Sequence, residues 1–350
     1  MDGGINDESG LALSIGQYHV PQLGKAYVDR LGGESGSGGG FPAGTLSPES
    51  ADRPSSRDGV RTYLLNAGPE LRYLVKLYAA ARASEITAEV TAAKLLDSAG
   101  VRVPSPVLED TSCRIFPVVY RVARFLEGFD LREGRATGRV DDEGMAALGG
   151  ELGGLMARVH SLSPQGVAEG ILGKRGDSLG EQAGQMLRVL ADQSLLEKGL
   201  LEHLRREVYQ GLERLHAQRD LRLVHGSLSL DHVIVEESGL NYFVSGLTGL
   251  RHAHLADPIW DIAHLELTVF VEEPLLRGSF LRAYLDNAPA LPSDVGSRMR
   301  LYVLLHLMGQ LTMRQVPGGE RAHIAAQLTE LLWRGSKSHG FSGFISPDAP

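Results

Sequence analysis

The strand-forming residues of this chain are concentrated in one part of it, and this uneven distribution limits the folds that it can adopt. Residues 55–127 are expected to form strands around a single helix at 84–100, because β-branched and aromatic runs surround one segment of helical periodicity. From Asp141 onward, apolar residues recur at spacings of three and four, which is typical of helices. The pattern predicts an α+β fold with a small β-rich domain over 55–127, a larger helical domain over 128–337 and a tail over 338–350.

The segment before residue 55 has a different composition. A short helix is expected at 22–31, and the following residues, 32–56, are dense in glycine, serine and proline. Segments of this kind form flexible linkers because they cannot bury enough apolar surface to fold. We therefore expect residues 1–54 to consist of a helix and a linker.

The overall charge and hydropathy argue against two classes of partner. A formal net charge of -8 provides no large positive field for nucleic acid. No segment has the length and apolar character of a membrane span, and the first residues lack the hydrophobic core of a signal peptide. A single cysteine, Cys113, excludes an internal disulfide. These features predict a cytoplasmic protein that binds neither nucleic acid nor membrane.

Lys76 and Glu89 are candidates for one half of a phosphate site. Lys76 lies in a predicted strand, and Glu89 lies in the helix that follows it. Protein kinases pair a strand lysine with a helix glutamate in this order so that the lysine can hold the phosphates of ATP. Taken singly, each residue could equally be a solvated surface charge, and it is their order in the chain that favours a pair.

Residues 221–249 read as strand, tight loop, strand, turn and strand. Phosphotransferases of the kinase type carry H-G-D-x-x-x-x-N in such a loop. The aspartate accepts the substrate proton, the asparagine binds a metal ion, and a later aspartate completes the metal site. In this chain His225 opens the motif, but Ser227 stands at the first aspartate position, His232 at the asparagine position and Ser245 at the second aspartate position.

The joint order of these segments resembles the aminoglycoside-phosphotransferase and choline-kinase-like family, which has the protein-kinase-like fold. The likeness extends over residues 55–335 and rests on the segments VKLY, RFLEGFDL, MARVHSL, LVHGSLSLDHVIV and DPIWDIA, taken in this order. It implies a bilobal fold with a small β-rich N-lobe, a larger helical C-lobe and a nucleotide such as ATP between them. The chain would be a degenerate member, because three positions of the catalytic motif differ from the family pattern.

The resemblance also assigns residues to the nucleotide. Lys76 and Glu89 would anchor the phosphates, while Arg124 and Phe125 belong to the hinge segment on the adenine side. Arg57 lies in SSRDGVRTY, which takes the place of the glycine-rich phosphate cover although it has one glycine only. This segment is either a cap over the nucleotide or an ordinary turn.

Two further residues are assigned structural roles by the resemblance. Asp257 and Asp261 lie in DPIWDIA, at the start of a predicted helix. In kinase-like folds the second of these aspartates ties its helix to the catalytic loop, so Asp261 is expected to brace the loop that contains His225.

The replaced positions bear directly on chemistry. The hydroxyl of Ser227 is too weakly basic to act as a general base near neutral pH. His232 offers a nitrogen and Ser245 a neutral hydroxyl, whereas Mg²⁺ prefers hard oxygen ligands, so the donor set argues against Mg²⁺. A site with His232 would favour Mn²⁺ or Zn²⁺, and Asp231 could swing into the metal site as a substitute ligand.

The retained residues are those that hold the fold and the nucleotide, and the replaced ones are those that do the chemistry. This contrast predicts a pseudokinase or weakly active subunit that binds a peptide or protein partner, with a lyase subunit as one candidate. Kinase-like subunits of class V lanthipeptide and thioamitide biosynthesis, which act on a precursor peptide, offer one such setting. The alternatives are an active ATP-dependent phosphotransferase, acting on a small-molecule hydroxyl or on Ser/Thr of a precursor peptide, and a small-ligand sensor without nucleotide.

Overall fold

The computed structural model contains an antiparallel sheet with one helix and a larger, mainly helical part, so the predicted α+β class is confirmed. The structure describes residues 45–48, 60–66, 72–78, 83–113, 118–163, 168, 171–173, 179–216, 221–239, 241–289, 291–313 and 318–334. The helix expected at 22–31 lies outside these residues. Residues 45–48, which belong to the segment expected to be a linker, form the strand β1.

The chain divides into two compact units. The first contains the described residues up to Val90 together with Pro104–Leu126, and the second contains Thr91–Val103 and the described residues from Glu127 onward. The second half of the first long helix, α3, is therefore assigned to the second unit, whereas the sequence analysis placed the whole helix in the N-lobe.

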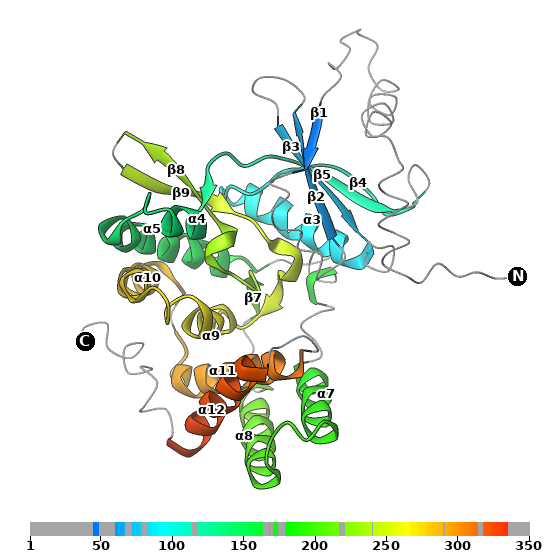
Figure 1. The fold of residues 1–350 in the computed structure, drawn as a ribbon, viewed down its shortest axis with the longest axis vertical. Helices are drawn as coiled ribbons and strands as arrows, with labels where there is room; N and C mark the ends of the chain where they lie inside the picture. The colour runs from blue at the N-terminus through cyan, green and yellow to red at the C-terminus, as the bar shows by residue number, and fades with distance from the viewer. Residues whose placement is uncertain are drawn as a thin grey trace, which may run out of the picture. The chain divides into compact units, whose positions relative to one another are not determined.

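The first unit is built on a five-stranded antiparallel sheet in the order β1-β2-β3-β5-β4, with α3 beside it (Figure 1). The strands β2 and β3 form an antiparallel hairpin, whose register joins Val60 to Tyr78. The strand β4 lies at one edge of this sheet and begins at Pro106. The elements are β1 (Thr45–Pro48), β2 (Val60–Asn66), β3 (Arg72–Tyr78), α3 (Ala83–Ser98), β4 (Pro106–Asp110) and β5 (Val119–Arg124).

The two faces of this sheet have separate cores. Successive side chains of a strand point to opposite faces. One face buries Tyr73, Val75, Leu77, Val118, Tyr120 and Val122. On the other face Tyr78 and Val119 pack against Ile86 and Val90 of α3. Lys76 lies two residues before Tyr78, so the strand period directs its side chain toward α3.

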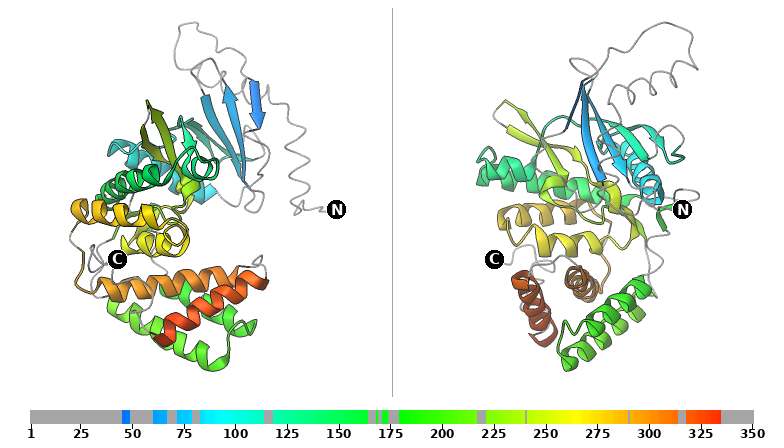
Figure 2. Two further views of the ribbon diagram at one scale, coloured as in Figure 1. Left: turned by 60° about the vertical axis from the view of Figure 1, so that its left-hand side comes forward. Right: turned by 45° about the vertical axis from the view of Figure 1, so that its right-hand side comes forward.

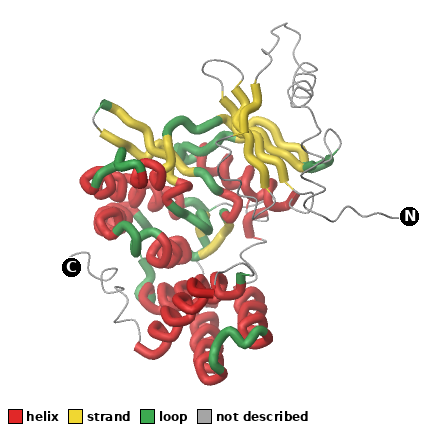
Figure 3. Tube along the Cα trace, viewed as in Figure 1, coloured by secondary structure: helices red, strands yellow, loops and turns green. Residues whose placement is uncertain are grey.

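The second unit is mainly helical, and Figure 3 shows its strands as short pairs among the helices. The strands form two small antiparallel sheets, β6-β8-β9 and β10-β7. The helices are α4 (Leu131–Ala136), α5 (Asp142–Ser161), α7 (Leu179–Asp192), α8 (Lys198–His216), α9 (Ile259–Thr268), α10 (Pro274–Asn287), α11 (Val295–Thr312) and α12 (Gly318–Arg334). The other elements are β6 (Phe129–Asp130), β7 (Arg222–Val224), η3 (Leu230–His232), β8 (Val233–Ser238), β9 (Asn241–Leu247), η4 (Leu250–His252) and β10 (His254–Ala256).

Two packing features position the loop between β7 and β8. The glycines of α5 allow close approach to α10, since a Cβ atom on Gly153 would lie 2.3 Å from the carbonyl oxygen of Phe280. The helices α7, α8, α11 and α12 pack together within this unit, and α11 also packs against α9 (Figure 2). The loop that follows β7 is held by α9, because Asp261 accepts the backbone N–H groups of His225 and Gly226.

Candidate functional site

Lys76 and Glu89 form an ion pair in the first unit. Lys76 Nζ lies 3.2 Å from Oε1 of Glu89, across the space between β3 and α3. Glu89 is buried, whereas the Lys76 side chain is 21% exposed and can meet a ligand. Strand alternation explains this arrangement, because it turns Lys76 toward the helix that carries the glutamate. The role of the pair in holding phosphates stays a prediction.

Two residues that the sequence analysis did not identify also bind Glu89. Arg121 of β5 places Nη1 2.7 Å from Oε1, and the Tyr78 hydroxyl donates to Oε2 at 2.7 Å. Burial alone would raise the pKa of Glu89, but Lys76, Arg121 and Tyr78 outweigh it and lower the pKa to about 2. The carboxylate is therefore ionised over the whole physiological pH range.

The residues expected beside the nucleotide base have contacts of their own. Arg124 is exposed at the end of β5. The half-buried ring of Phe125 lies under the Arg72 guanidinium, 4.6 Å from its centroid, and its backbone N–H donates to the Arg72 carbonyl. Arg57 lies outside the described residues.

In the second unit, Asp261 supports the loop from below. One carboxylate oxygen accepts the backbone N–H of His225 at 2.7 Å, and the other accepts that of Gly226 at 2.8 Å. His160 of α5 donates from Nε2 at 3.1 Å, and its Nδ1 lies 2.8 Å from the Tyr284 hydroxyl. Burial would raise the pKa of Asp261, but these donors outweigh it and hold the pKa below its ordinary value. The loop is thus held by a buried carboxylate.

Asp257 has a comparable structural place at the start of α9. One of its oxygens accepts the N–H of Ile259, and the other pairs with the buried Arg298 at 2.7 Å. The sequence analysis missed Arg298 and His160. The position of His160 in the segment MARVHSL was the available signal.

His225 is buried and serves the loop rather than a substrate. Its Nε2 lies 2.7 Å from the Thr248 carbonyl and must donate to it. Burial, followed by the neighbouring His232, lowers the pKa of His225 to about 4, so the ring is neutral near pH 7. The remaining nitrogen, Nδ1, is buried and has no hydrogen-bond partner among the described residues.

The tip of the loop holds the replaced positions. The hydroxyl oxygen of Ser227 is buried and makes no hydrogen bond within the described part of the chain. His232 Nδ1 lies 3.0 Å from the Ser227 carbonyl and 3.3 Å from the Ser229 hydroxyl. The His232 ring rests on Gly249, where a Cβ atom would lie 2.3 Å from it. Gly249 has φ +73°, so both this conformation and this contact favour glycine.

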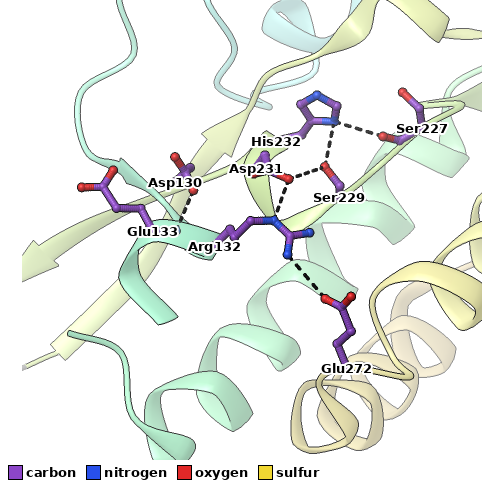
Figure 4. A network of polar contacts seen from close by, with 8 residues as sticks. All are labelled: Asp130, Arg132, Glu133, Ser227, Ser229, Asp231, His232 and Glu272. Carbon is purple, nitrogen blue, oxygen red and sulfur yellow. Dashed lines mark hydrogen bonds and ion pairs between the residues drawn. The ribbon is translucent and has the colours of Figure 1, made fainter. Parts of the chain in front are cut away.

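Asp231 is engaged away from the expected metal position. Figure 4 shows its carboxylate beside Arg132 of α4, with 2.8 Å between Nε and Oδ2. Arg132 also reaches Glu272, at 3.4 Å. The pair is half exposed, with 37% of the Arg132 side chain and 46% of the Asp231 side chain accessible. Asp231 could act as a substitute metal ligand only after leaving Arg132.

Ser245 is also committed to a protein partner. It is buried in β9, and its hydroxyl donates to Oε1 of Glu236 on β8. The same oxygen lies 3.1 Å from the Arg102 guanidinium. In the described residues, no group of three or more His, Cys, Asp or Glu side chains is placed to hold a metal ion. The two metal positions offer a nitrogen of His232 and the neutral hydroxyl of Ser245, and this donor set does not fit Mg²⁺.

The comparisons with solved structures show the same fold. The chain is similar to a putative aminoglycoside phosphotransferase from Ralstonia eutropha, with TM-score 0.63, 14% identity, and coverage of 89% of this chain and 98% of the other. It also matches the GDP complex of aminoglycoside 2'-phosphotransferase-IIIa, with TM-score 0.57, 18% identity, and coverage of 90% and 98%. For the ADP-bound aminoglycoside phosphotransferase APH(2'')-Ib, the TM-score is 0.57, the identity 14% and the coverage 89% and 98%.

Sequence comparison with curated proteins gives no match. None of the helices in the described ranges has the length and apolar character needed to cross a membrane. The sequence model of the phosphotransferase enzyme family matches residues 54–301, well over half of the chain. The chain therefore belongs to the phosphotransferase enzyme family.

Proposed function

We propose that this protein binds a nucleotide through Lys76 and transfers phosphoryl groups slowly or not at all. The observation that carries the proposal is the loop tip, where Ser227 stands at the position of the general base. The carboxylate nearest to it in sequence, Asp231, pairs with Arg132. Nucleotide binding is supported by the partly exposed side chain of Lys76 and by the GDP and ADP complexes of structurally similar proteins.

The missing groups account for a large loss of rate. A positioned general base contributes about 10²–10⁴ in rate, and a hydroxyl such as that of Ser227 cannot replace it. His232 and Ser245 supply no charge to balance a divalent ion, and each has a protein partner. The chain keeps Lys76, whose ammonium can contact a phosphate, and the loop between β7 and β8 that Asp261 holds in place.

Calorimetric titration with ADP and ATP, in EDTA and in Mg²⁺, tests this proposal together with an assay of phosphate release. We expect binding that does not need the metal. Lys76→Ala should weaken it about tenfold or more, because a charge-assisted contact is lost. Lys94→Ala, which changes an exposed lysine of α3, is the matched control. If the unmodified protein transfers phosphoryl groups and Ser227→Ala abolishes this transfer, the proposal of a slow or inactive protein is wrong.

An active phosphotransferase is the second candidate, and one observation favours it. The Asp231–Arg132 pair is half exposed, and pairs of this kind contribute about 0–1 kcal/mol. A substrate that attracts Arg132 could therefore release Asp231. Metal-dependent nucleotide binding, with turnover that Asp231→Asn removes, would establish this alternative.

The partner and the pathway remain proposals. A peptide or protein partner, with a lyase subunit of modified-peptide biosynthesis as one case, fits a kinase-like chain that lacks its base. A sensor of small ligands would bind no nucleotide at all, so the same titration separates it from the first two candidates.

A further inference from the structure

Glu89 lies between two cations rather than one. Lys76 and Arg121 both contact Oε1, at 3.2 and 2.7 Å. Two positive side chains and one carboxylate leave the cluster with one positive charge in excess. A single lysine–glutamate pair would be neutral, so the addition of Arg121 changes the charge that a ligand meets.

The two cations are not equivalent. Lys76 and Arg121 are direct partners in the register of β3 and β5, and like charges in such positions repel each other. Arg121 is 3% exposed, and Nη2 also donates to the Pro104 carbonyl. Lys76 is the more exposed of the two, and its contact is longer than the 2.7–2.9 Å typical of strong charge-assisted hydrogen bonds. Arg121 is thus the buried partner of Glu89, joined to it by an ion pair, and Lys76 is the more exposed partner, joined to it by a hydrogen bond.

We propose that Arg121 is a positioning residue that neutralises Glu89 from the buried side and leaves the Lys76 ammonium available to an anionic phosphate group. This inference rests on the proposed nucleotide binding through Lys76. Arg121 shares the Glu89 carboxylate with Lys76 and so weakens its hold on the Lys76 ammonium, although the two still contact at 3.2 Å.

Titration with ADP in EDTA distinguishes this arrangement from a simple pair. Arg121→Met should weaken ADP about tenfold although Lys76 is intact, because Glu89 then binds Lys76. The double variant Arg121→Met/Glu89→Gln should recover affinity to within about threefold of the wild type, since the competing carboxylate is gone. A merely structural role for Arg121 predicts the opposite, because the double variant removes still more buried contacts.

A second measurement follows Lys76 without any nucleotide. Acetylation by an N-hydroxysuccinimide ester, read by mass spectrometry, reports how freely the amine reacts. Arg121→Met should slow the labelling of Lys76 about tenfold, because the ester reacts with the free amine and a paired carboxylate favours the ammonium form. Lys94 on α3 is exposed and should react equally in all variants. If Arg121→Met does not fold, Arg121→Lys keeps the charge and should give smaller changes in the same directions.

The outcomes separate the two proposals. Failure of the wild type to bind ADP, or unchanged affinity in Lys76→Met, defeats the proposed function, while the labelling experiment still decides the role of Arg121. A folded Arg121→Met protein that labels at the wild-type rate overturns the inference. So does loss of ADP binding in Glu89→Gln, which would mean that Glu89 itself positions Lys76.

Discussion

The two sides of the loop between β7 and β8 differ in how completely their polar atoms are paired. On the buried side, Asp261 accepts two backbone N–H groups and a donor from His160. On the outer side, which is the tip of the loop, the Ser227 hydroxyl is itself buried but has no partner within the described residues, and Asp231 is held by a half-exposed arginine. The difference indicates that the loop conformation is strongly determined, whereas the groups at its tip are only weakly constrained.

This contrast extends to the first unit. Glu89, like Asp261, is a buried carboxylate, and it is contacted by Lys76, Tyr78 and Arg121. Buried carboxylates of this kind stabilise a structure only when their partners are present. The chain therefore keeps two buried carboxylates that depend on their partners, although the residues at the catalytic and metal positions of the motif have changed.

The largest effect is expected from removing the buried brace. Asp261→Ala leaves two backbone donors and His160 without their acceptor, and loss of one partner from a buried charged pair costs about 3–5 kcal/mol. Asp231→Ala is the matched control on the outer side, with an expected cost of at most about 1 kcal/mol. Urea unfolding of both variants measures the difference, and equal losses would remove the distinction between the two sides.

A smaller effect is expected from acid, and it too belongs to the buried side. The pKa of His225 is about 4 in the folded protein, against an ordinary value of 6.5. Between these values the unfolded chain binds a proton that the folded chain does not. Stability should therefore fall as the pH drops from 6.5 toward 4, and should not depend on this group above 6.5. Between its two pKa values, each such group changes the free energy of unfolding by about 1.4 kcal/mol per pH unit.

The pH effect can be assigned by substitution. His306, whose pKa burial lowers to about 3, acts in the same direction as His225. In His225→Gln the amide can still donate to the Thr248 carbonyl, but it binds no proton. The slope of unfolding free energy against pH should then fall by roughly one proton. An unchanged slope would show that His225 does not titrate as its burial implies.

Local patterns in the sequence were sufficient for some of this site and not for the rest. The order of a strand lysine followed by a helix glutamate predicted that Lys76 and Glu89 would form a pair, and the family resemblance of the DPIWDIA segment indicated Asp261. Arg121 meets Glu89 only because β5 pairs with β3 in one register, and a sequence does not reveal which residues of distant strands face each other. Short-range reasoning also suggested that Asp231 could serve a metal.

The actual partner of Asp231, Arg132, lies 99 residues away in the chain. Contacts over such separations depend on how α4 packs against η3. The replaced positions at 227, 232 and 245 could be read directly, but their new partners could not. Glu236, for example, faces Ser245 through a β-bulge in the pairing of β8 with β9.

The smallest effect is expected at the loop tip itself. Ser227→Ala removes a buried hydroxyl that makes no hydrogen bond in the described part of the chain, so stability should change by less than about 1 kcal/mol and could rise. Ser229→Ala is the control, because that hydroxyl contacts both Asp231 and His232. Its loss should cost about 0.5–1.5 kcal/mol. Thermal and urea unfolding of both variants decides between these values. A Ser227→Ala protein that is less stable than Ser229→Ala would show that the Ser227 hydroxyl is firmly bound, and that the outer side of the loop is as constrained as the buried one.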